Sequence, residues 1–246
     1  MTKDAIVFKN VCKEFSPGDF GVRDLDFQIK EGEMVAIVGK TGCGKSTAFN
    51  LLLGLTKPTS GQVKVDGLDP YQSFQEFKGK LGMVFQNDRL LPWRTALENA
   101  AIGLEVNGLK EKERNKIAME WLERLGLSGW EDKFPHELSG GMKQRVSIAR
   151  AFSVDPKIIL CDESFSALDE LTAIKLRKEF VHLIRENNKT GVFITHSIGE
   201  AIEMADRVLV YKKPGHVAKE ITVPSEIDVK KMEELRKNIL NGMDIA

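Results

Sequence analysis

The stretch GKTGCGKST, residues 39–47, decides the fold of this chain. It follows the apolar run MVAIVG (34–39), which is typical of a fully buried strand, and it precedes a pattern that predicts a helix from Lys45 to about Gly54. A glycine-rich turn between a strand and a helix points backbone N–H groups inward, beside the positive end of the helix dipole. The stretch therefore predicts a site for phosphate groups at the end of a buried strand.

The residue types in this stretch suit a nucleoside triphosphate. Lys45 supplies a charge for the β- and γ-phosphates, the Ser46 hydroxyl can ligate Mg²⁺, and Thr47 can contact a phosphate oxygen. Glycine at positions 42 and 44 allows close backbone approach, and Cys43 contributes its backbone N–H rather than its thiol. The spacing Gly-x-x-x-x-Gly-Lys-Ser is the P-loop pattern, which assigns nucleotide binding to Gly39, Thr41, Gly42, Cys43, Gly44, Lys45, Ser46 and Thr47.

Composition excludes several other classes of protein. The chain has 246 residues with 36 Lys+Arg and 36 Asp+Glu, so it lacks the basic excess of a duplex-binding protein, and we expect no nucleic acid partner. Cys12, Cys43 and Cys161 fit neither a disulfide framework nor a zinc site. The N-terminus lacks the apolar core of a signal peptide, and no apolar run is long enough to cross a bilayer. If the protein works at a membrane, a partner must hold it there.

Strand and helix patterns alternate along most of the chain. Helical patterns dominate between residues 87 and 152, where Thr95 and Glu98 predict a capping box. The alternation predicts an α/β fold with a mainly parallel sheet, an early antiparallel β portion and an inserted helical subdomain. With the P-loop pattern, this plan resembles the P-loop NTPase (RecA-like) fold. We expect one domain over residues 1–246, divided into a nucleotide-binding core (1–86 and 153–226), the helical subdomain (87–152) and a C-terminal helical tail (227–246).

Polar side chains end three of the predicted strands. IILCDE (158–163) ends in two carboxylates, of which Asp162 is placed to hold Mg²⁺ and Glu163 to act as general base on a water. Gln86 and His196 end two other strands at the edge where α/β folds bind ligands. We expect Gln86 to ligate Mg²⁺ or touch the water, and His196 to bond the γ-phosphate. The alternative for each is a structural role at a strand end.

A second phosphate-binding pattern lies about a hundred residues after the first, in PHELSGGMKQR (135–145). Ser139 can cap the helix that starts there or donate to a phosphate oxygen, and the two glycines that follow allow close backbone approach. The helix dipole adds attraction for an anion. The first pattern already provides a site for the phosphates of one nucleotide. The presence of a second phosphate-binding pattern in the same chain therefore requires a separate explanation.

Five motifs in order resemble the ATP-binding cassette (ABC) ATPases over roughly residues 4–220: GKTGCGKST, Gln86, LSGGM (138–142), IILCDE with SALD (166–169), and His196. In that family two cassettes pack head to tail, and ATP lies between the P-loop of one and the LSGG stretch of the other. The resemblance implies that the signature residues of one copy contact the nucleotide bound at the P-loop of a second copy; these residues are Ser139, Gly140, Gly141 and Met142. It also implies that Asp169 belongs to a loop at the dimer contact.

The resemblance also implies an aromatic ring against adenine, for which Phe15 is the candidate and Phe20 the alternative. The chain departs from the family pattern at three positions. Met142 stands where glutamine is commonest, Ser164 where proline is usual, and Ser166 where glycine is frequent. A serine in place of proline frees the backbone after Glu163.

The stretches NDRLLPWRTALENAAIGLE (87–105), PHELSGGMKQRVSIARAF (135–152) and DRVLVYKKPG (206–215) look like cassettes of bacterial importers for nitrate, sulfonates and taurine. In such importers a short helix of the transmembrane subunit docks near the Gln86 loop. The apolar surface for it would come from Leu90, Leu91, Pro92 and Trp93. Alternatively, Trp93 packs as a local staple under the helix that Thr95 begins.

These resemblances imply the ATP-hydrolysing subunit of a bacterial importer, using ATP and Mg²⁺. We expect Ser46, Gln86 and Asp162 to ligate the metal. The expected partners are a second copy, transmembrane permease subunits and an extracellular solute-binding protein, with the chain peripheral at the cytoplasmic face of the membrane. The alternative is a non-transport ABC ATPase that acts on a soluble macromolecule. A small-molecule P-loop kinase would leave LSGGM unexplained.

Overall fold

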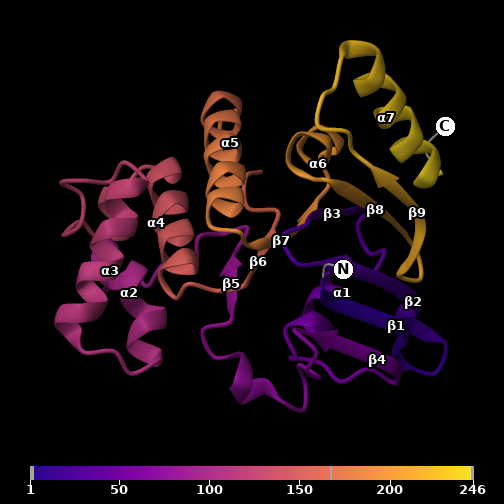
Figure 1. Ribbon diagram of the computed structural model, residues 1–246, viewed down its shortest axis with the longest axis horizontal. Helices are drawn as coiled ribbons and strands as arrows, with labels where there is room; N and C mark the ends of the chain where they lie inside the picture. Colours follow the sequence, from indigo (N-terminus) through magenta and orange to yellow (C-terminus); the bar gives the residue numbers. More distant parts are fainter. Residues whose placement is uncertain (1–2, 167, 245–246) are drawn as a thin grey trace. The chain divides into compact units, whose positions relative to one another are not determined.

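A computed structural model describes residues 3–166 and 168–244 (Figure 1). The chain forms two compact units, the first built from residues 1–77 and 190–246 and the second from residues 78–189. The predicted helical subdomain, 87–152, lies within the second unit, and the predicted tail lies within the first, where its last two residues fall outside the described range.

The first unit contains an antiparallel sheet of three strands in the order β2-β1-β4. Phe8 of β1 pairs with Phe27 of β2, and their rings stack with centroids 4.6 Å apart. These strands form the early antiparallel β portion that the sequence predicted, and register shifts interrupt the pairing of β1 with β2. The strand bounds are β1 (Asp4–Ser16), β2 (Asp19–Lys30) and β4 (Ser60–Val65).

The predicted P-loop strand lies at the centre of the parallel portion of the first unit. β3 pairs in parallel with β7 on one side and β8 on the other, and β9 adds an antiparallel edge to β8. β3 and β7 are buried throughout, which explains the apolar runs MVAIVG in β3 and GVFI in β7. The bounds are β3 (Met34–Gly39), β7 (Thr190–Thr195), β8 (Arg207–Lys212) and β9 (His216–Thr222).

The helices of the first unit cover these strands. α6 packs against β3 and β7, and α7 packs against β8, β9 and α6, as Figure 1 shows near the C-terminus. Asp228 caps α7, and Leu235 and Ile239 bury its inner face. The bounds are α1 (Lys45–Leu52), the 3₁₀ helix η1 (Phe74–Phe77), α6 (Ile198–Met204) and α7 (Val229–Gly242).

The second unit joins two parallel strands to four α-helices. β5 and β6 pair so that Val84 lies opposite Cys161, and α2, α3 and α4 pack against one another. The capping box predicted at Thr95 and Glu98 is confirmed, with both reciprocal hydrogen bonds present. The bounds are β5 (Leu81–Val84), α2 (Ala96–Val106), α3 (Glu111–Arg124), η2 (Pro135–Glu137), α4 (Gly140–Ser153), β6 (Ile158–Asp162) and α5 (Glu170–Glu186).

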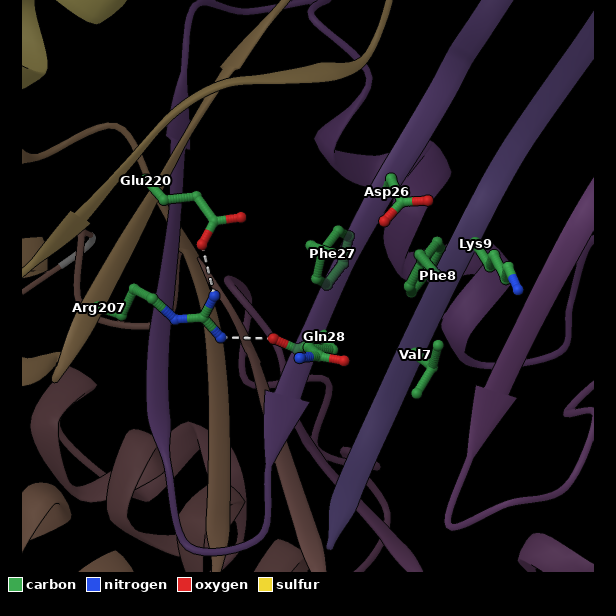
Figure 2. A pocket seen from close by; sticks show the side chains of 8 residues that line it. All are labelled: Val7, Phe8, Lys9, Asp26, Phe27, Gln28, Arg207 and Glu220. Carbon is green, nitrogen blue, oxygen red and sulfur yellow. Dashed lines mark hydrogen bonds and ion pairs between the residues drawn. The ribbon is translucent and has the colours of Figure 1, made fainter. Parts of the chain in front are cut away.

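A charged cleft of about 510 Å³ lies in the first unit at the start of β8 (Figure 2). The Arg207 guanidinium donates to the Glu33 carboxylate at 2.7 Å, to the Glu220 carboxylate at 2.7 Å, and to the carbonyl oxygen of Gln28. Burial alone would lower the pKa of Arg207, but the hydrogen bonds to the two carboxylates outweigh it and raise that pKa. Arg207 thus ties β2, β8, β9 and the turn before β3 together.

Replacing Arg207 with alanine should lower the free energy of unfolding by about 2–3 kcal/mol, because it leaves the largely buried Glu33 carboxylate without its ion pair. Urea denaturation followed by circular dichroism measures the change. Lys231→Ala is the control, since its exposed pair with Glu234 on α7 should contribute less than about 1 kcal/mol. Equal losses in the two variants would contradict a structural role for the Arg207 cluster.

Candidate nucleotide-binding site

The P-loop stretch forms a turn between β3 and α1 in the first unit. Gly42 and Gly44 have φ of 75° and 105°, a region that favours glycine. A Cβ on Gly39 would lie 2.6 Å from the Cys43 sulfur, so only glycine fits there as well. Thr41 and Ser46 are exposed on this turn. The first turn of α1 is Lys45-Ser46-Thr47, so its positive end faces solvent without a carboxylate in that turn.

Lys45 is folded back over its own loop. Its side chain is buried, and Nζ donates to the carbonyl oxygens of Gly39 at 2.7 Å and Lys40 at 3.1 Å. The Cys43 sulfur lies 4.0 Å from the same ammonium, and burial raises the pKa of this thiol, so it stays protonated. The ammonium is held where the turn would enclose an anion.

Glycines outside the predicted motif let the turn close. A Cβ on Gly44 would lie 2.3 Å from the carbonyl oxygen of Gly21 and 2.8 Å from Cα of Gly215. A Cβ on Gly215 would in turn lie 2.4 Å from the Gly21 oxygen. Sequence reasoning missed both Gly21 and Gly215. The only available signal was the turn sequence KKPG (212–215), which does not reveal its spatial neighbour.

Phe15 lies beside the P-loop helix. A Cβ on Gly21 would meet both the Phe15 ring at 2.6 Å and the Thr47 hydroxyl at 2.8 Å, so the two side chains flank this glycine. The Phe15 ring is 61% exposed, and the Lys13 ammonium lies 5.4 Å from its centroid. The alternative ring, Phe20, is half-buried and covered by a guanidinium. An exposed ring beside the P-loop suits stacking on a base, which favours Phe15.

His196 follows β7 at the same edge of the first unit as the P-loop. Thr195 pairs with Val38 in the parallel register, so His196 and Gly39 are the next residues along their strands. The imidazole is exposed. The Thr195 hydroxyl donates to the Glu200 carboxylate at 2.5 Å, and the Ser197 hydroxyl caps α6 by accepting from the Glu200 N–H. These bonds fix the backbone on either side of the histidine.

Gln86 and Glu163 meet at the carboxyl ends of β5 and β6 in the second unit. The Gln86 amide nitrogen donates to Glu163 Oε2 at 3.2 Å. Asp162 is the last residue of β6 and is half-buried, as is Glu163. The structure thus brings together three of the predicted strand-end residues. The thiol of Cys161 just beneath them is fully enclosed, and burial raises its pKa.

The backbone at Glu163 is held in an unusual conformation. Its φ is 46°, in the left-handed region that non-glycine residues rarely adopt and that often marks functional sites. The Ser164 hydroxyl donates to the carbonyl oxygen of Val84 at 2.9 Å, and the Ser166 hydroxyl donates to that of Glu163 at 2.9 Å. Ser164 and Ser166 both depart from the family pattern, and Ser164 stands where proline is usual. Their hydrogen bonds therefore restrain the backbone after Glu163 in place of a proline ring.

The signature stretch forms the start of α4 in the second unit. The Ser139 hydroxyl accepts from the Met142 N–H at 3.3 Å and so caps the helix, as expected. Ser139 and Gly140 are exposed, while Gly141 and Met142 are half-buried. Asp169 caps α5 in the same way by accepting from the Thr172 N–H, and hydrogen bonds from Thr172 lower the pKa of this carboxyl. Ser139 and Asp169, the residues that cap these two helices, are both exposed.

These features define a protein that binds nucleoside phosphates at a P-loop. The sequence profile of the ABC transporter family matches residues 22–166. The chain is 39% identical to an uncharacterized ABC transporter ATP-binding protein of Methanocaldococcus jannaschii over 95% of this chain and 89% of that protein. It is 38% identical to the taurine import ATP-binding protein TauB of Yersinia pestis over 84% of this chain and 80% of the relative.

The glycine betaine/proline betaine transport ATP-binding protein ProV of Escherichia coli is equally similar, with 38% identity over 92% of this chain, which spans 57% of that longer protein. Among solved structures, a dimeric ATP-binding cassette in a post-hydrolysis state with ADP and Pi is 36% identical, with a TM-score of 0.77 over 90% of this chain and 100% of that one. The protein belongs to the ABC transporter family and is an ATPase of that family, which confirms the predicted α/β P-loop fold.

Proposed function

We propose that this ATPase powers an importer for a small solute, by binding Mg²⁺·ATP between two copies of itself. The observation that supports it most is the presence of two helix starts without an acidic side chain in the first turn, at the P-loop and at Ser139, each of which suits a phosphate group. One belongs to the first unit and the other to the second. A head-to-tail pair of copies gives both of them a role at the same nucleotide.

The chemistry of the residues expected to ligate the metal suits a magnesium ion. Within residues 3–166 and 168–244 no group of three or more His, Cys, Asp or Glu side chains could hold a metal alone. Mg²⁺ instead accepts a few protein oxygens together with phosphate and water. The Ser46 hydroxyl, the Gln86 amide oxygen and the Asp162 carboxylate supply oxygens of this kind. The bound ion would neutralise charge on the phosphates.

We propose the following catalytic roles, which rest on the residue types and on the contacts within each unit. Lys45 would exchange its two carbonyl partners for phosphate oxygens, and Phe15 would stack on the adenine. Glu163, oriented by the Gln86 amide, would take the proton of the attacking water. His196, held between two fixed backbone segments, would donate to the γ-phosphate. Loss of that phosphate removes the contacts that hold the copies together, so hydrolysis would reopen the pair.

The narrower choice of solute is also a proposal. The loop NDRLLPWRT (87–95) favours importers of the nitrate, sulfonate and taurine group. However, relatives named for glycine betaine and trimethylamine N-oxide transport are at least as similar as TauB, with 38–44% identity. We therefore propose a small solute of this wider range, delivered through a permease and an extracellular solute-binding protein that this chain does not supply.

A partner at the membrane would dock on the second unit. No helix within residues 3–166 and 168–244 is long and apolar enough to cross a membrane. A mainly apolar cleft of about 320 Å³ lies between β5, α2 and the end of α4, lined by Met83, Ile102 and Val106 among others. A short apolar helix of a permease would suit it, which would place the chain peripherally at the cytoplasmic face.

The loop before α2 in the same unit is held by hydrogen bonds and presents an aromatic side chain. Asn99, fully buried in α2, accepts from the Leu91 N–H at 2.7 Å and donates to three carbonyl oxygens of the same loop. Trp93 is 70% exposed, so it does not act as the local staple, and Pro92 is exposed as well. Leu90 was expected on this surface but is buried, because it faces the core of the unit.

Replacing Ser139 with arginine tests the proposed role of the signature stretch. The bulky cation should obstruct the second copy and raise the dissociation constant of the ATP-bound dimer at least about hundredfold. ATP affinity of the monomer should stay within about twofold, since the P-loop lies in the other unit. Sedimentation of Glu163→Gln protein with ATP, with and without the substitution, measures the dimer. Ser128→Arg, at another exposed serine of the second unit, is the control.

If Ser139→Arg and Ser128→Arg dimerise equally well with ATP, the signature stretch does not meet a second copy, and the proposed sharing of the nucleotide is wrong. The loss of the helix cap costs about 1 kcal/mol by itself. The melting temperature of the nucleotide-free variant separates this local effect from a loss of contact.

A further inference from the structure

A guanidinium near the end of α4 holds the loop that follows Gln86. Arg150 Nη1 donates to the carbonyl oxygen of Arg89 at 2.8 Å, and Nη2 donates to that of Asp88 at 2.6 Å. Nη2 also donates at 3.2 Å to the hydroxyl of Ser147, which is fully buried one turn earlier on the same helix. Both ends of one planar fork are thus bound to consecutive carbonyl groups of the loop.

A residue that only stabilised the fold would not need a charge at this position. Arg150 borders the mainly apolar cleft between β5, α2 and α4, and burial lowers the pKa of its guanidinium, so placing a cation there is costly. An unbranched apolar side chain such as methionine would fill this space without that cost. The loop gains from the charge, because Arg89 has φ of 49°, a conformation that non-glycine residues rarely adopt unaided.

The segment that Arg150 holds begins beside the residue that meets Glu163. The Gln86 amide nitrogen donates to Glu163 Oε2 at 3.2 Å. Gln86 is exposed, so packing against the core does not fix its side chain, and the backbone of the loop decides where its amide points. Only Asn87 separates Gln86 from Asp88, and the backbone has only two soft dihedrals per residue, so a shift at Asp88 passes to Gln86.

The other half of the loop is held independently. The Asn99 side chain on α2 forms hydrogen bonds with backbone groups between Leu91 and Thr95. Arg150 and Asn99 thus divide the loop between them. Removal of Arg150 should therefore loosen the half beside Gln86 and leave the half beside α2 in place.

We propose that Arg150 is a positioning residue for ATP hydrolysis, which holds the loop after Gln86 so that the Gln86 amide orients Glu163. Its role rests on the proposed function, in which Glu163 takes the proton of the attacking water. All of these contacts lie within the second unit, whereas the P-loop belongs to the first. Loss of Arg150 should therefore lower the rate of hydrolysis and leave the affinity for ATP nearly unchanged.

A double-mutant cycle on the full chain tests whether Arg150 acts through Gln86. Phosphate release at saturating ATP is measured for Arg150→Met, for Gln86→Ala and for the variant with both changes. Each single change should lower kcat at least about tenfold, because catalysis depends on the placement of groups around bound substrate, and should leave KM for ATP within about threefold of the parent. The variant with both changes should lie within about twofold of Gln86→Ala, since no amide remains for Arg150 to position.

A conservative variant and a matched control separate positioning from stability. Arg150→Lys should hydrolyse ATP at least about threefold faster than Arg150→Met, because one ammonium can still reach one of the two carbonyl oxygens. Arg145→Met is the control on the same helix, where the guanidinium donates to the carbonyl oxygen of Leu125 and to the Glu179 carboxylate. This control should lower the melting temperature but leave kcat within about twofold of the parent.

Two results would show that Arg150 is not a positioning residue: a parental kcat for Arg150→Met, or losses that multiply to at least about a hundredfold in the variant with both changes. A parental kcat for Gln86→Ala would instead overturn the proposed role of Gln86, and the role of Arg150 with it. All rates are measured below the melting temperature of the least stable variant. If Arg150→Met does not fold, the same cycle with Arg150→Lys decides between these outcomes.

Discussion

Replacing Glu163 with glutamine should lower the rate of ATP hydrolysis at least about a thousandfold while leaving ATP bound. Glutamine keeps the shape of the side chain but cannot accept the proton of the attacking water. The Gln86 amide, which now donates to Glu163 Oε2 at 3.2 Å, could still donate to the new amide oxygen, so the local geometry should survive. Phosphate release measures the rate, and equilibrium binding of a fluorescent ATP analogue measures the affinity.

The same substitution should trap a dimer in the presence of ATP, because the nucleotide that joins the copies is no longer cleaved. Glu120→Gln, an equally conservative change at an exposed position of α3, should hydrolyse ATP at the parental rate. Hydrolysis by Glu163→Gln within about tenfold of the parent would remove Glu163 from the role of general base. Asp162 would then be the next carboxylate to test.

Replacing Lys45 with alanine should weaken ATP binding at least about hundredfold and abolish hydrolysis at cellular ATP concentrations. The ammonium is the one fixed positive charge that the loop itself encloses, and charge-assisted hydrogen bonds to phosphate each contribute about 1.5–3 kcal/mol. Isothermal titration with ATP measures the loss. Lys40→Ala, which removes an exposed lysine of the same loop, should change the affinity less than about threefold.

Loss of Lys45 also leaves the carbonyl oxygens of Gly39 and Lys40 without their shared donor. The melting temperature of the nucleotide-free variant must therefore be recorded beside the affinity. A folded Lys45→Ala protein that binds ATP as tightly as the parent would show that the backbone N–H groups and the helix dipole suffice. That result would contradict the assignment of Lys45 to the phosphates.

The sequence was sufficient to predict the α/β class, the strand–turn–helix at the P-loop and the capping box at Thr95. Each of these depends on residues that are close together in the sequence. Strand β9 was missed because its exposed edge carries mostly polar residues and lacks a continuous apolar pattern. The close approach of Gly21 and Gly215 to Gly44 was missed because distant segments make it.

The hydrogen-bond partners of side chains in the candidate site also could not be predicted from the sequence. Nothing local indicates that the Ser164 hydroxyl reaches the carbonyl oxygen of Val84, or that Lys45 bonds its own loop. The solute could not be predicted because the residues that select it are not in this chain. For the same reason relatives named for taurine, betaine and trimethylamine N-oxide transport are similarly close.

The second unit is one continuous segment, whereas the first is assembled from both ends of the chain. During synthesis β3 leaves the ribosome long before β7 and β8, the two strands between which it pairs. The second unit can therefore fold cotranslationally. During that time the apolar strand MVAIVG lacks both of its neighbouring strands, so its backbone hydrogen-bonding groups are unpaired on either edge. Such a strand is prone to aggregation, so nascent chains that stall before residue 190 should depend on chaperones for their solubility.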